Sequence, residues 1–174
     1  MKIYLVRHGQ TQYNVERRAT GVVDVPLTQA GILQVQDATR ECPKDIVKIF
    51  SSDLMRCKQT AQIFAEYLSV SIEYDARLRE RNFGTLEGKK IDEFETGLWQ
   101  KDINQEYDYR PYGGESVLDV RTRLESVLSD IRNEYPDGHV LIVAHGGIVR
   151  LLQKIYLGKP EDKVHNSLIY EFDI

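Results

Sequence analysis

The chain has 174 residues, of which 41% are hydrophobic and 29% charged, and its formal net charge is -4. This length fits one domain with a continuous core, and the composition is typical of globular proteins, not of disordered ones. A negative net charge disfavours nucleic acid and anionic membrane surfaces as partners. No apolar stretch approaches the ~20 residues that a membrane-spanning helix needs.

The amino-terminal apolar stretch meets the charged Arg7 almost at once. It is too short for the apolar region of a signal peptide, so we expect a cytoplasmic protein. The two cysteines, Cys42 and Cys57, form neither a CxxC pair nor a disulfide framework. We expect Cys57 to be a small core residue.

Short β-rich apolar runs alternate with helical patterns, which predicts a single α/β domain over residues 1–174 with a mostly parallel sheet. The predicted strands are Lys2–Arg7, Ile46–Ser51, Ser71–Tyr74, His139–Ala144 and, at an edge of the sheet, Ser167–Phe172.

Four longer helices are expected. Thr28 caps the first, which runs to about Arg40, and Asp53 is the predicted N-cap of the second. Ser116 is followed three residues later by an aspartate, a variant of the capping box, and begins the helix with the clearest period. The apolar stretch Ile148–Leu157 is predicted to be a buried helix.

The segment from Lys89 to Tyr112 has no clean period, and it is predicted to be a short helix plus a loop that covers the site as a lid. Its aromatic residues are expected to pack within the lid. Its acids outnumber its basic residues, so we expect an acidic, aromatic rim at the pocket mouth. The acids are Asp92, Glu93, Glu95, Asp102, Glu106 and Asp108, and the basic residues are Lys89, Lys90, Lys101 and Arg110.

Two histidines and two arginines follow the ends of predicted strands. The first strand runs into Arg7 and His8, the second leads to Arg56, and the fourth ends at His145. Ligands of open α/β sheets bind at the carboxyl ends of the strands, so these side chains should converge on one crevice.

This group of residues suits a phosphoryl group. Arginine presents a planar fork that matches two phosphate oxygens and keeps its charge at any working pH. A histidine is nucleophilic when neutral, and its pKa near 6.5 leaves it mostly neutral at pH 7. The free N–H groups of the helix that begins at Gly146 and Gly147 are suited to bind an anion.

Six blocks of sequence, in this order, resemble the histidine phosphatase (phosphoglycerate mutase-like) superfamily and cover most of the chain. They are Leu5–Thr11 (LVRHGQT), Gly21–Gly31 (GVVDVPLTQAG), Ser51–Ala61 (SSDLMRCKQTA), Leu78–Gly84 (LRERNFG), Gly113–Ser116 (GGES) and Val143–Gly147 (VAHGG). The resemblance implies a three-layer sandwich with helices on both faces of the sheet.

The resemblance also implies roles for single residues. His8 is implied as the nucleophile that becomes phosphohistidine, with Arg7, Arg56 and His145 completing the phosphate pocket. Glu80 is implied as the proton donor to the leaving oxygen. Asn14, Thr20, Gly21 and Gly146 are implied substrate contacts. No metal and no other cofactor is implied.

Glu80 must be protonated to donate a proton, and an ordinary glutamate is ionised at neutral pH. A desolvated pocket would raise its pKa, whereas adjacent arginines would lower it. The sequence leaves the sign of this sum open, and Glu87 is the other candidate acid. His139 and His165 lack comparable partners, and we expect both at the surface.

Three functions are consistent with these residues. The first is a metal-independent phosphomonoesterase that acts on a small phosphorylated metabolite, and the second is a cofactor-dependent phosphoglycerate mutase. The mutases carry a longer segment with a paired-arginine substrate contact, and residues 89–112 contain no adjacent arginine pair. The third is a protein phosphohistidine phosphatase. The expected partner is a small-molecule phosphate ester, and a homodimer is left open.

Overall fold

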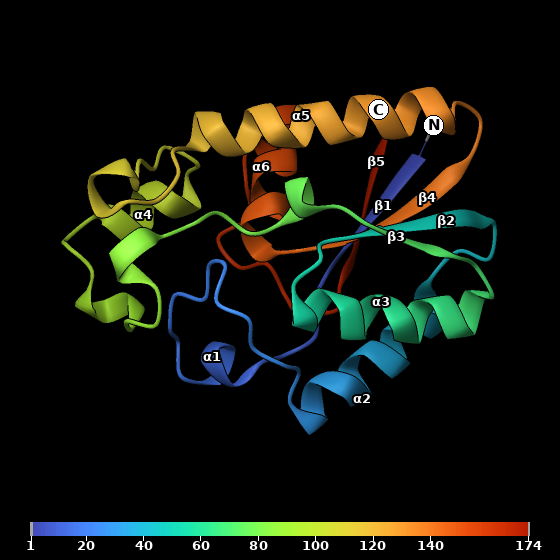
Figure 1. Ribbon diagram of the computed structural model, residues 1–174, viewed down its shortest axis with the longest axis horizontal. Coiled ribbons are helices and arrows are strands. Elements are labelled where there is room, and N and C mark those ends of the chain that lie inside the picture. Colours follow the sequence, from blue (N-terminus) through green and yellow to red (C-terminus); the bar gives the residue numbers. More distant parts are fainter. Residues whose placement is uncertain (1, 174) are drawn as a thin grey trace.

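A five-stranded sheet forms the centre of the protein in the computed structural model, which describes residues 2–173 (Figure 1). The strand order is β3-β2-β4-β1-β5, and all neighbours are parallel except β5, which pairs antiparallel with β1 at the edge. The strands are β1 (Lys2–Arg7), β2 (Ile46–Ser51), β3 (Ile72–Tyr74), β4 (His139–Ala144) and β5 (Ile169–Asp173).

Side chains of β1 alternate between two apolar layers, as the period of two in a strand requires. Ile3 and Leu5 join the core beneath α5 (Val117–Glu134) and α6 (Gly146–Leu157). Tyr4 and Val6 join the core beneath α2 (Gln29–Ala38) and α3 (Met55–Leu68). Figure 1 shows the two helix pairs on opposite faces of the sheet. The predicted three-layer α/β architecture is confirmed.

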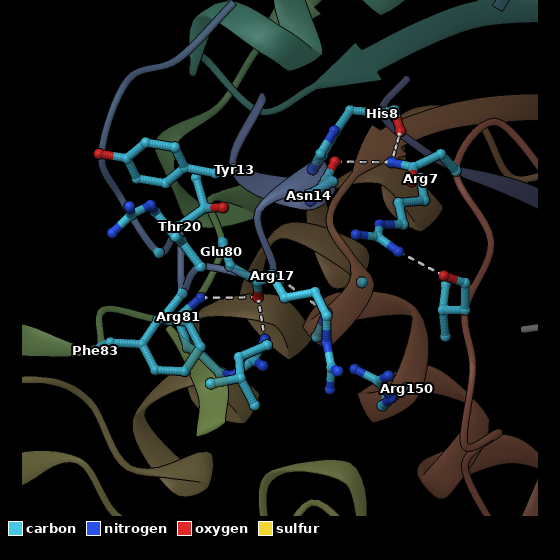
Figure 2. A pocket seen from close by; sticks show the side chains of 18 of the residues that line it. Arg7, His8, Tyr13, Asn14, Arg17, Thr20, Glu80, Arg81, Phe83 and Arg150 are labelled. Carbon is cyan, nitrogen blue, oxygen red and sulfur yellow. Dashed lines mark hydrogen bonds and ion pairs between the residues drawn. The ribbon is translucent and has the colours of Figure 1, made fainter. Parts of the chain in front are cut away.

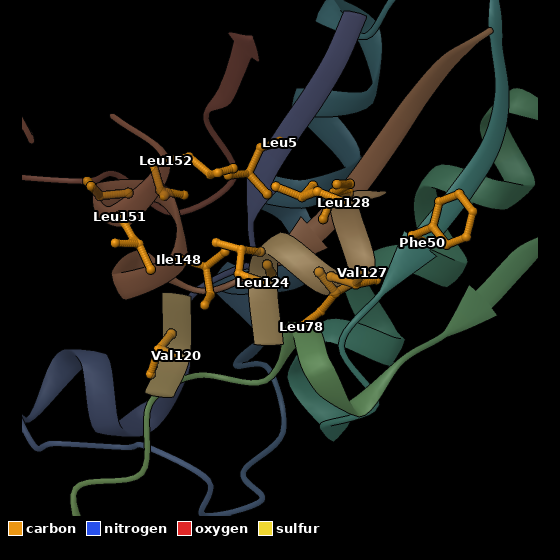
Figure 3. Close-up of a cluster of buried hydrophobic side chains, with 14 of the residues drawn as sticks. Leu5, Phe50, Leu78, Val120, Leu124, Val127, Leu128, Ile148, Leu151 and Leu152 are labelled. Atoms are coloured by element: carbon orange, nitrogen blue, oxygen red, sulfur yellow. The ribbon is translucent and has the colours of Figure 1, made fainter. Parts of the chain in front are cut away.

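The larger core lies between the sheet and the helices α5 and α6 (Figure 3). Leu124 and Leu128 of α5 meet Ile148 and Leu152 of α6 beside Leu5 of β1, and all five are nearly or fully buried. This packing fixes the start of α6, which follows directly from the end of β4.

Two of the three predicted helix caps are confirmed. Thr28 accepts a hydrogen bond from Gly31 N, and Ser116 forms a reciprocal capping box with Asp119. Asp53 is not the N-cap of α3, because its carboxylate binds Arg79 in two hydrogen bonds of 2.6 Å. Leu54 is the N-cap, and its side chain makes no capping hydrogen bond. Asp24, which lies 31 residues earlier in the chain, accepts the hydrogen bond from Met55 N instead.

Other predicted boundaries shift by a few residues. Ser167 lies in the left-handed region at φ 61°, so β5 begins only at Ile169. Helix α6 begins at Gly146, at the glycine pair expected to open it, and the predicted apolar stretch Ile148–Leu157 forms the rest of it. Helix α2 ends at Ala38 and passes into a 3-10 turn, η1 (Thr39–Glu41).

The segment 89–112 contains short helical turns around α4 (Leu98–Ile103), as predicted. Phe94, Tyr107 and Tyr109 are buried in the core that α5 covers, so their packing joins the segment to the body of the protein. Among the described residues, no helix combines the length and apolar character that a membrane span requires. The remaining short elements are α1 (Gln12–Val15), η2 (Ala76–Leu78), η3 (Gly84–Leu86), η4 (Ile91–Glu93) and η5 (Arg110–Tyr112).

Gly31→Ala tests how tightly α2 packs on the loop after β1. In an ordinary helix interior, alanine in place of glycine stabilises by about 1 kcal/mol. Here a Cβ at Gly31 would lie 2.2 Å from the carbonyl oxygen of Gln10. We therefore expect Gly31→Ala to destabilise the protein instead, with the free energy of unfolding measured in urea falling by ~1–3 kcal/mol. The exposed Gln36→Ala in the same helix is the control, and a Gly31→Ala protein more stable than wild type would contradict the packing.

Candidate active site

The ends of β1 and β4 place two histidine rings side by side. His8 follows β1 and His145 follows β4, which is the neighbouring parallel strand. Their ring centroids are 5.3 Å apart, and both residues are buried. The predicted convergence of the strand ends on one crevice is therefore present.

His8 is held as a neutral imidazole, and one of its ring nitrogens is unprotonated and faces the pocket. Its Nδ1 lies 2.8 Å from the carbonyl oxygen of Gly9, which can only accept, so Nδ1 carries the proton and donates. Nε2 keeps its lone pair, towards which Arg56 Nε points from 3.3 Å. Burial and then the positive charge of Arg56 lower the His8 pKa well below its usual value.

Arg56 is fully buried and has no carboxylate within ion-pair distance in residues 2–173. Its Nη1 donates to the carbonyl of Val23, and its Nη2 donates to the carbonyl of Gly21. The same Nη2 lies 3.2 Å from Nδ1 of His145. Backbone carbonyls thus satisfy the guanidinium without cancelling its charge.

His145 is fixed from both sides of its ring. Because Arg56 can only donate, Nδ1 accepts, and Nε2 carries the proton and donates to Ser52 Oγ at 2.9 Å. The Cys57 thiol packs against the same ring, with Sγ 3.4 Å from Nε2. Burial raises the pKa of Cys57 to about 12, so it is an inert core residue as predicted. Burial and the nearby arginines lower the His145 pKa well below its usual value.

Arg7 supplies a second guanidinium to this crevice. One Nη donates to the carbonyl of Val164, while the buried Nε has no hydrogen-bond partner in the described part of the chain. Burial and then repulsion from Arg150 lower the Arg7 pKa to about 10, so it is still charged at neutral pH. An anion in the crevice would relieve this repulsion.

Glu80 is an ionised carboxylate in the free protein. Its Oε2 accepts from Gly147 N at 3.0 Å and its Oε1 accepts from Arg81 N at 3.0 Å. Burial alone would raise its pKa, but Arg81 and these two N–H groups prevail and lower it to about 2. The sequence left open whether the Glu80 pKa is raised or lowered, and the structure shows that it is lowered.

Glycine at position 147 is required for this contact. A Cβ there would lie 1.9 Å from Arg81 Nη1 and 2.4 Å from Glu80 Oε1. The carboxylate of Glu80 therefore occupies part of the α6 N-terminus, where the sequence predicted an anion-binding backbone. Gly146, one residue earlier, still lines the pocket.

The pocket over these groups has a volume of about 320 Å³, at the lower end of the range for small-molecule sites (Figure 2). His145 lies behind His8 and Arg56, outside the lining. Of the two candidate acids, Glu80 lines the pocket, and Glu87 instead accepts from Val22 N at 2.9 Å. The other predicted residues that line the pocket are Arg7, His8, Asn14, Thr20, Gly21, Arg56 and Gly146.

The expectation of an acidic rim from segment 89–112 is wrong. Asp102 is fully buried and paired with Arg81, and Asp108 pairs with Arg110. The segment contributes only Ile91 and Trp99 to the lining, since most of its aromatic side chains pack into the core. None of its six acids lines the pocket.

The pocket lining is mostly basic, which the sequence did not predict. Besides Arg7 and Arg56 it contains Arg17, Arg18, Arg81, Arg150 and Lys163, against the acids Glu80 and Asp162. Of these, Arg81 and Arg150 are buried, whereas Arg17 and Lys163 are exposed. Arg150 carried a usable signal, because it is the only cation in the first two turns of an otherwise apolar helix. Arg17 carried none, since its place in the pocket depends on how the chain turns after α1.

The remaining histidines differ in position. His139 is half-buried and lies 2.7 Å from Asp45, away from the pocket. His165 is exposed as predicted, and it lies at the pocket mouth. Within residues 2–173, no group of three or more His, Cys, Asp or Glu side chains is arranged to hold a metal ion.

The family model of the histidine phosphatase superfamily (branch 1) matches residues 3–171. The chain belongs to this superfamily. It is 40% identical over 164 residues to a protein of Escherichia coli O1:K1 named "Probable phosphoglycerate mutase GpmB", and this match covers 92% of the chain and 76% of that protein.

Solved structures of this superfamily share the fold closely. A mycobacterial glucosyl-3-phosphoglycerate phosphatase in complex with VO3 superimposes with a TM-score of 0.87 at 28% identity, over 98% of this chain and 91% of that one. Bacillus stearothermophilus YhfR superimposes with a TM-score of 0.88 at 28% identity, over 99% and 91%. The predicted phosphoglycerate mutase-like fold is confirmed.

The neutral state of the two buried histidines gives a test by NMR. Both have a lower pKa in the folded protein than the usual value of about 6.5 in the unfolded chain. The unfolded chain therefore binds protons first as the pH falls, so stability is lost below about pH 6.5. We expect the ring nitrogens of His8 and His145 to keep their neutral chemical shifts at pH 6 in the folded protein and to titrate in urea. Titration of either ring near pH 6.5 in the folded state would contradict the geometry.

Proposed function

We propose that this protein is a metal-independent phosphomonoesterase that hydrolyses a small phosphate ester through a phosphohistidine at His8. The observation that carries the proposal is the unprotonated Nε2 of a neutral His8, which faces Arg56 at 3.3 Å in a pocket that Arg7 also lines. A neutral imidazole is a nucleophile, and two guanidinium groups match the charge of a phosphoryl dianion.

In the first step Nε2 of His8 attacks phosphorus and the ester P–O bond breaks. The leaving oxygen keeps the bonding electron pair and takes up a proton. Arg7 and Arg56 flank the phosphoryl group, whose charge spreads over its equatorial oxygens as it transfers, and His145 supports Arg56 from outside the pocket lining. These residues supply positive charge and position, which is most of what phosphoryl transfer needs.

The proton for the leaving oxygen must reach Glu80 with the substrate, because Glu80 is ionised in the empty pocket. Phosphate monoesters have a second pKa near 6, so part of the substrate arrives as the monoanion. A bound phosphate also raises the pKa of a neighbouring carboxylate. Glu80 would take the proton as the ester binds and pass it to the leaving oxygen.

In the second step water attacks the phosphorus of phosphohistidine and the P–N bond breaks. The ionised Glu80 accepts a proton from this water, and His8 regains its lone pair. The products are the alcohol and inorganic phosphate. Glu80 begins this second step ionised, because it gave its proton to the leaving oxygen in the first.

Mutase activity is the second candidate, because the Escherichia coli relative is named a probable phosphoglycerate mutase and the pocket lining is mostly basic. In a mutase the phosphohistidine returns its phosphoryl group to a second held ester instead of water. We favour hydrolysis because segment 89–112 places no cation in the pocket lining, and the mycobacterial relative with the same fold is a phosphatase.

His8→Ala tests the nucleophile. Loss of the attacking nitrogen should reduce phosphate release from p-nitrophenyl phosphate by ~10³-fold or more. Wild-type protein quenched during turnover should carry an acid-labile, base-stable phosphoryl group on His8, located by mass spectrometry. His139→Ala, away from the pocket, is the control and should keep wild-type activity.

The same assay with EDTA tests the independence from metal. Guanidinium groups supply the positive charge, so chelation should leave the rate unchanged. A rate that falls with EDTA and returns with Mg²⁺ would refute the metal-independent mechanism, and full activity in His8→Ala would refute the phosphohistidine.

The choice between hydrolase and mutase depends on the fate of the phosphoryl group. Given 3-phosphoglycerate with a trace of 2,3-bisphosphoglycerate, the protein should show negligible conversion to 2-phosphoglycerate. It should release inorganic phosphate from at least one metabolite ester, measured with both products followed in one reaction. Interconversion faster than phosphate release from every ester tested would make the mutase the correct function.

A further inference from the structure

The cations of the pocket lining exceed what one phosphoryl group needs. Arg7 and Arg56 already provide two positive charges beside His8 for a phosphoryl dianion. Arg17, Arg150 and Lys163 line the same pocket, and none of them has an ion-pair partner among residues 2–173. The mechanism above leaves these three unused.

Arg150 is a buried cation without a counterion. It is 8% exposed, and its bonds go to main-chain oxygens: Nε donates to the carbonyl of Glu161 and one Nη to that of Asp162. Its second Nη makes no hydrogen bond within the described part of the chain. A buried charge is costly unless it is paired, so this arginine is arranged for an anion that arrives from outside.

Arg17 is a second cation of the pocket lining without a counterion. Its backbone lies in the left-handed region at φ 55° because it follows the end of α1, where Arg17 N donates to the carbonyl of Asn14 and Arg18 N to that of Tyr13 in a helix C-cap. Its side chain is exposed and has no hydrogen bond or ion pair with any described residue. The guanidinium is therefore available to an anion in the pocket.

The two arginines face the same part of the pocket. Figure 2 shows the guanidinium groups of Arg17 and Arg150 directed into one region, away from His8. Arg150 is also close enough to Arg7 to be the charge that most strongly lowers its pKa. An anion between Arg17 and Arg150 would therefore lie beside the phosphoryl group, within the reach of one small molecule.

We infer that Arg17 and Arg150, with Lys163 at the mouth, form a second anion subsite, and that the substrate is a small phosphate ester with a second anionic group. This inference rests on the proposed hydrolysis and names the substrate class. A carboxylate and a second phosphate share the required chemistry, and a fork of two N–H groups binds either one. A pocket of about 320 Å³ keeps the two groups only a few bonds apart.

General attraction of phosphate esters by a basic mouth is the alternative explanation. Such steering also favours the more highly charged ester, but it works from exposed charges and is screened by salt. Buried Arg150 is poorly placed for it. A subsite holds the second anion at short range beside a buried charge, so its preference between two esters that differ only in that anion persists at high salt.

Two matched pairs of esters test the subsite. The carboxylate pair is 3-phosphoglycerate and glycerol 3-phosphate, and the phosphate pair is 1,3-propanediol bisphosphate and 3-hydroxypropyl phosphate. A charge-assisted hydrogen bond contributes ~1.5–3 kcal/mol, so wild-type kcat/KM should favour the anionic member of at least one pair by about tenfold or more. The pair that shows the preference identifies the second anion.

Arg150→Gln should remove most of that preference, about tenfold, mainly through the KM of the anionic ester. Arg17→Gln acts at an exposed position and should reduce it by about threefold. Because Arg17 is at the surface, this variant stays informative if Arg150→Gln melts early. Arg132→Gln removes the same charge from an exposed position on α5, outside the pocket lining, and should keep the wild-type preference.

Equal kcat/KM values within both pairs, or a preference that survives both arginine substitutions, would overturn the subsite. A preference that high salt abolishes would show steering instead. Calorimetric binding of each pair to His8→Ala separates the two proposals. If the anionic member binds more tightly but no ester releases phosphate in wild type, the subsite holds and hydrolysis fails. If phosphate is released without preference, hydrolysis holds and the subsite fails.

Discussion

The uncompensated charge of Arg56 is the constraint on which the rest of the site depends. This guanidinium is fully buried, and it bonds to two backbone carbonyls and two imidazole nitrogens, with no carboxylate beside it in residues 2–173. A carboxylate partner would lower the cost of burial and also cancel the charge. The carbonyls satisfy the N–H groups and leave the charge for an anion, and burial together with that same charge lowers the pKa of both histidines.

The pKa of Glu80 depends on a different part of the chain. Glu80 touches Arg81, whose guanidinium also binds the fully buried Asp102 of α4 through Nε and Nη2. Tyr109 donates a hydrogen bond to the same aspartate at 2.8 Å. Segment 89–112 therefore influences the Glu80 carboxylate through Arg81, although it gives the pocket only Ile91 and Trp99. A protein can in this way adjust a carboxylate of a pocket from a segment that contributes little to the lining.

The strands and two of the helix caps were predictable because they depend on residues that are close together in the sequence. Short β-rich apolar runs located the strands, and the caps at Thr28 and Ser116 depend on residues three positions away. Long-range ion pairs decided what the sequence could not show. Asp53 left its predicted cap because Arg79 binds it from another element. The acidic rim failed because Asp102 turns inward to Arg81, and whether a charged residue faces solvent or a buried partner is a property of the folded chain.

The loop before α2 and the first turn of α3 are bound together at several points. Gly21 and Val23 give their carbonyls to Arg56, and Asp24 caps the helix that carries it. Moving this loop outward would break the cap and two hydrogen bonds of a buried cation at once. This side of the pocket is therefore joined to α3 at three points. On the other side, Lys163 and His165 are exposed on the strand-free stretch before β5. The pocket thus has one wall cross-linked by hydrogen bonds and one wall that presents exposed side chains.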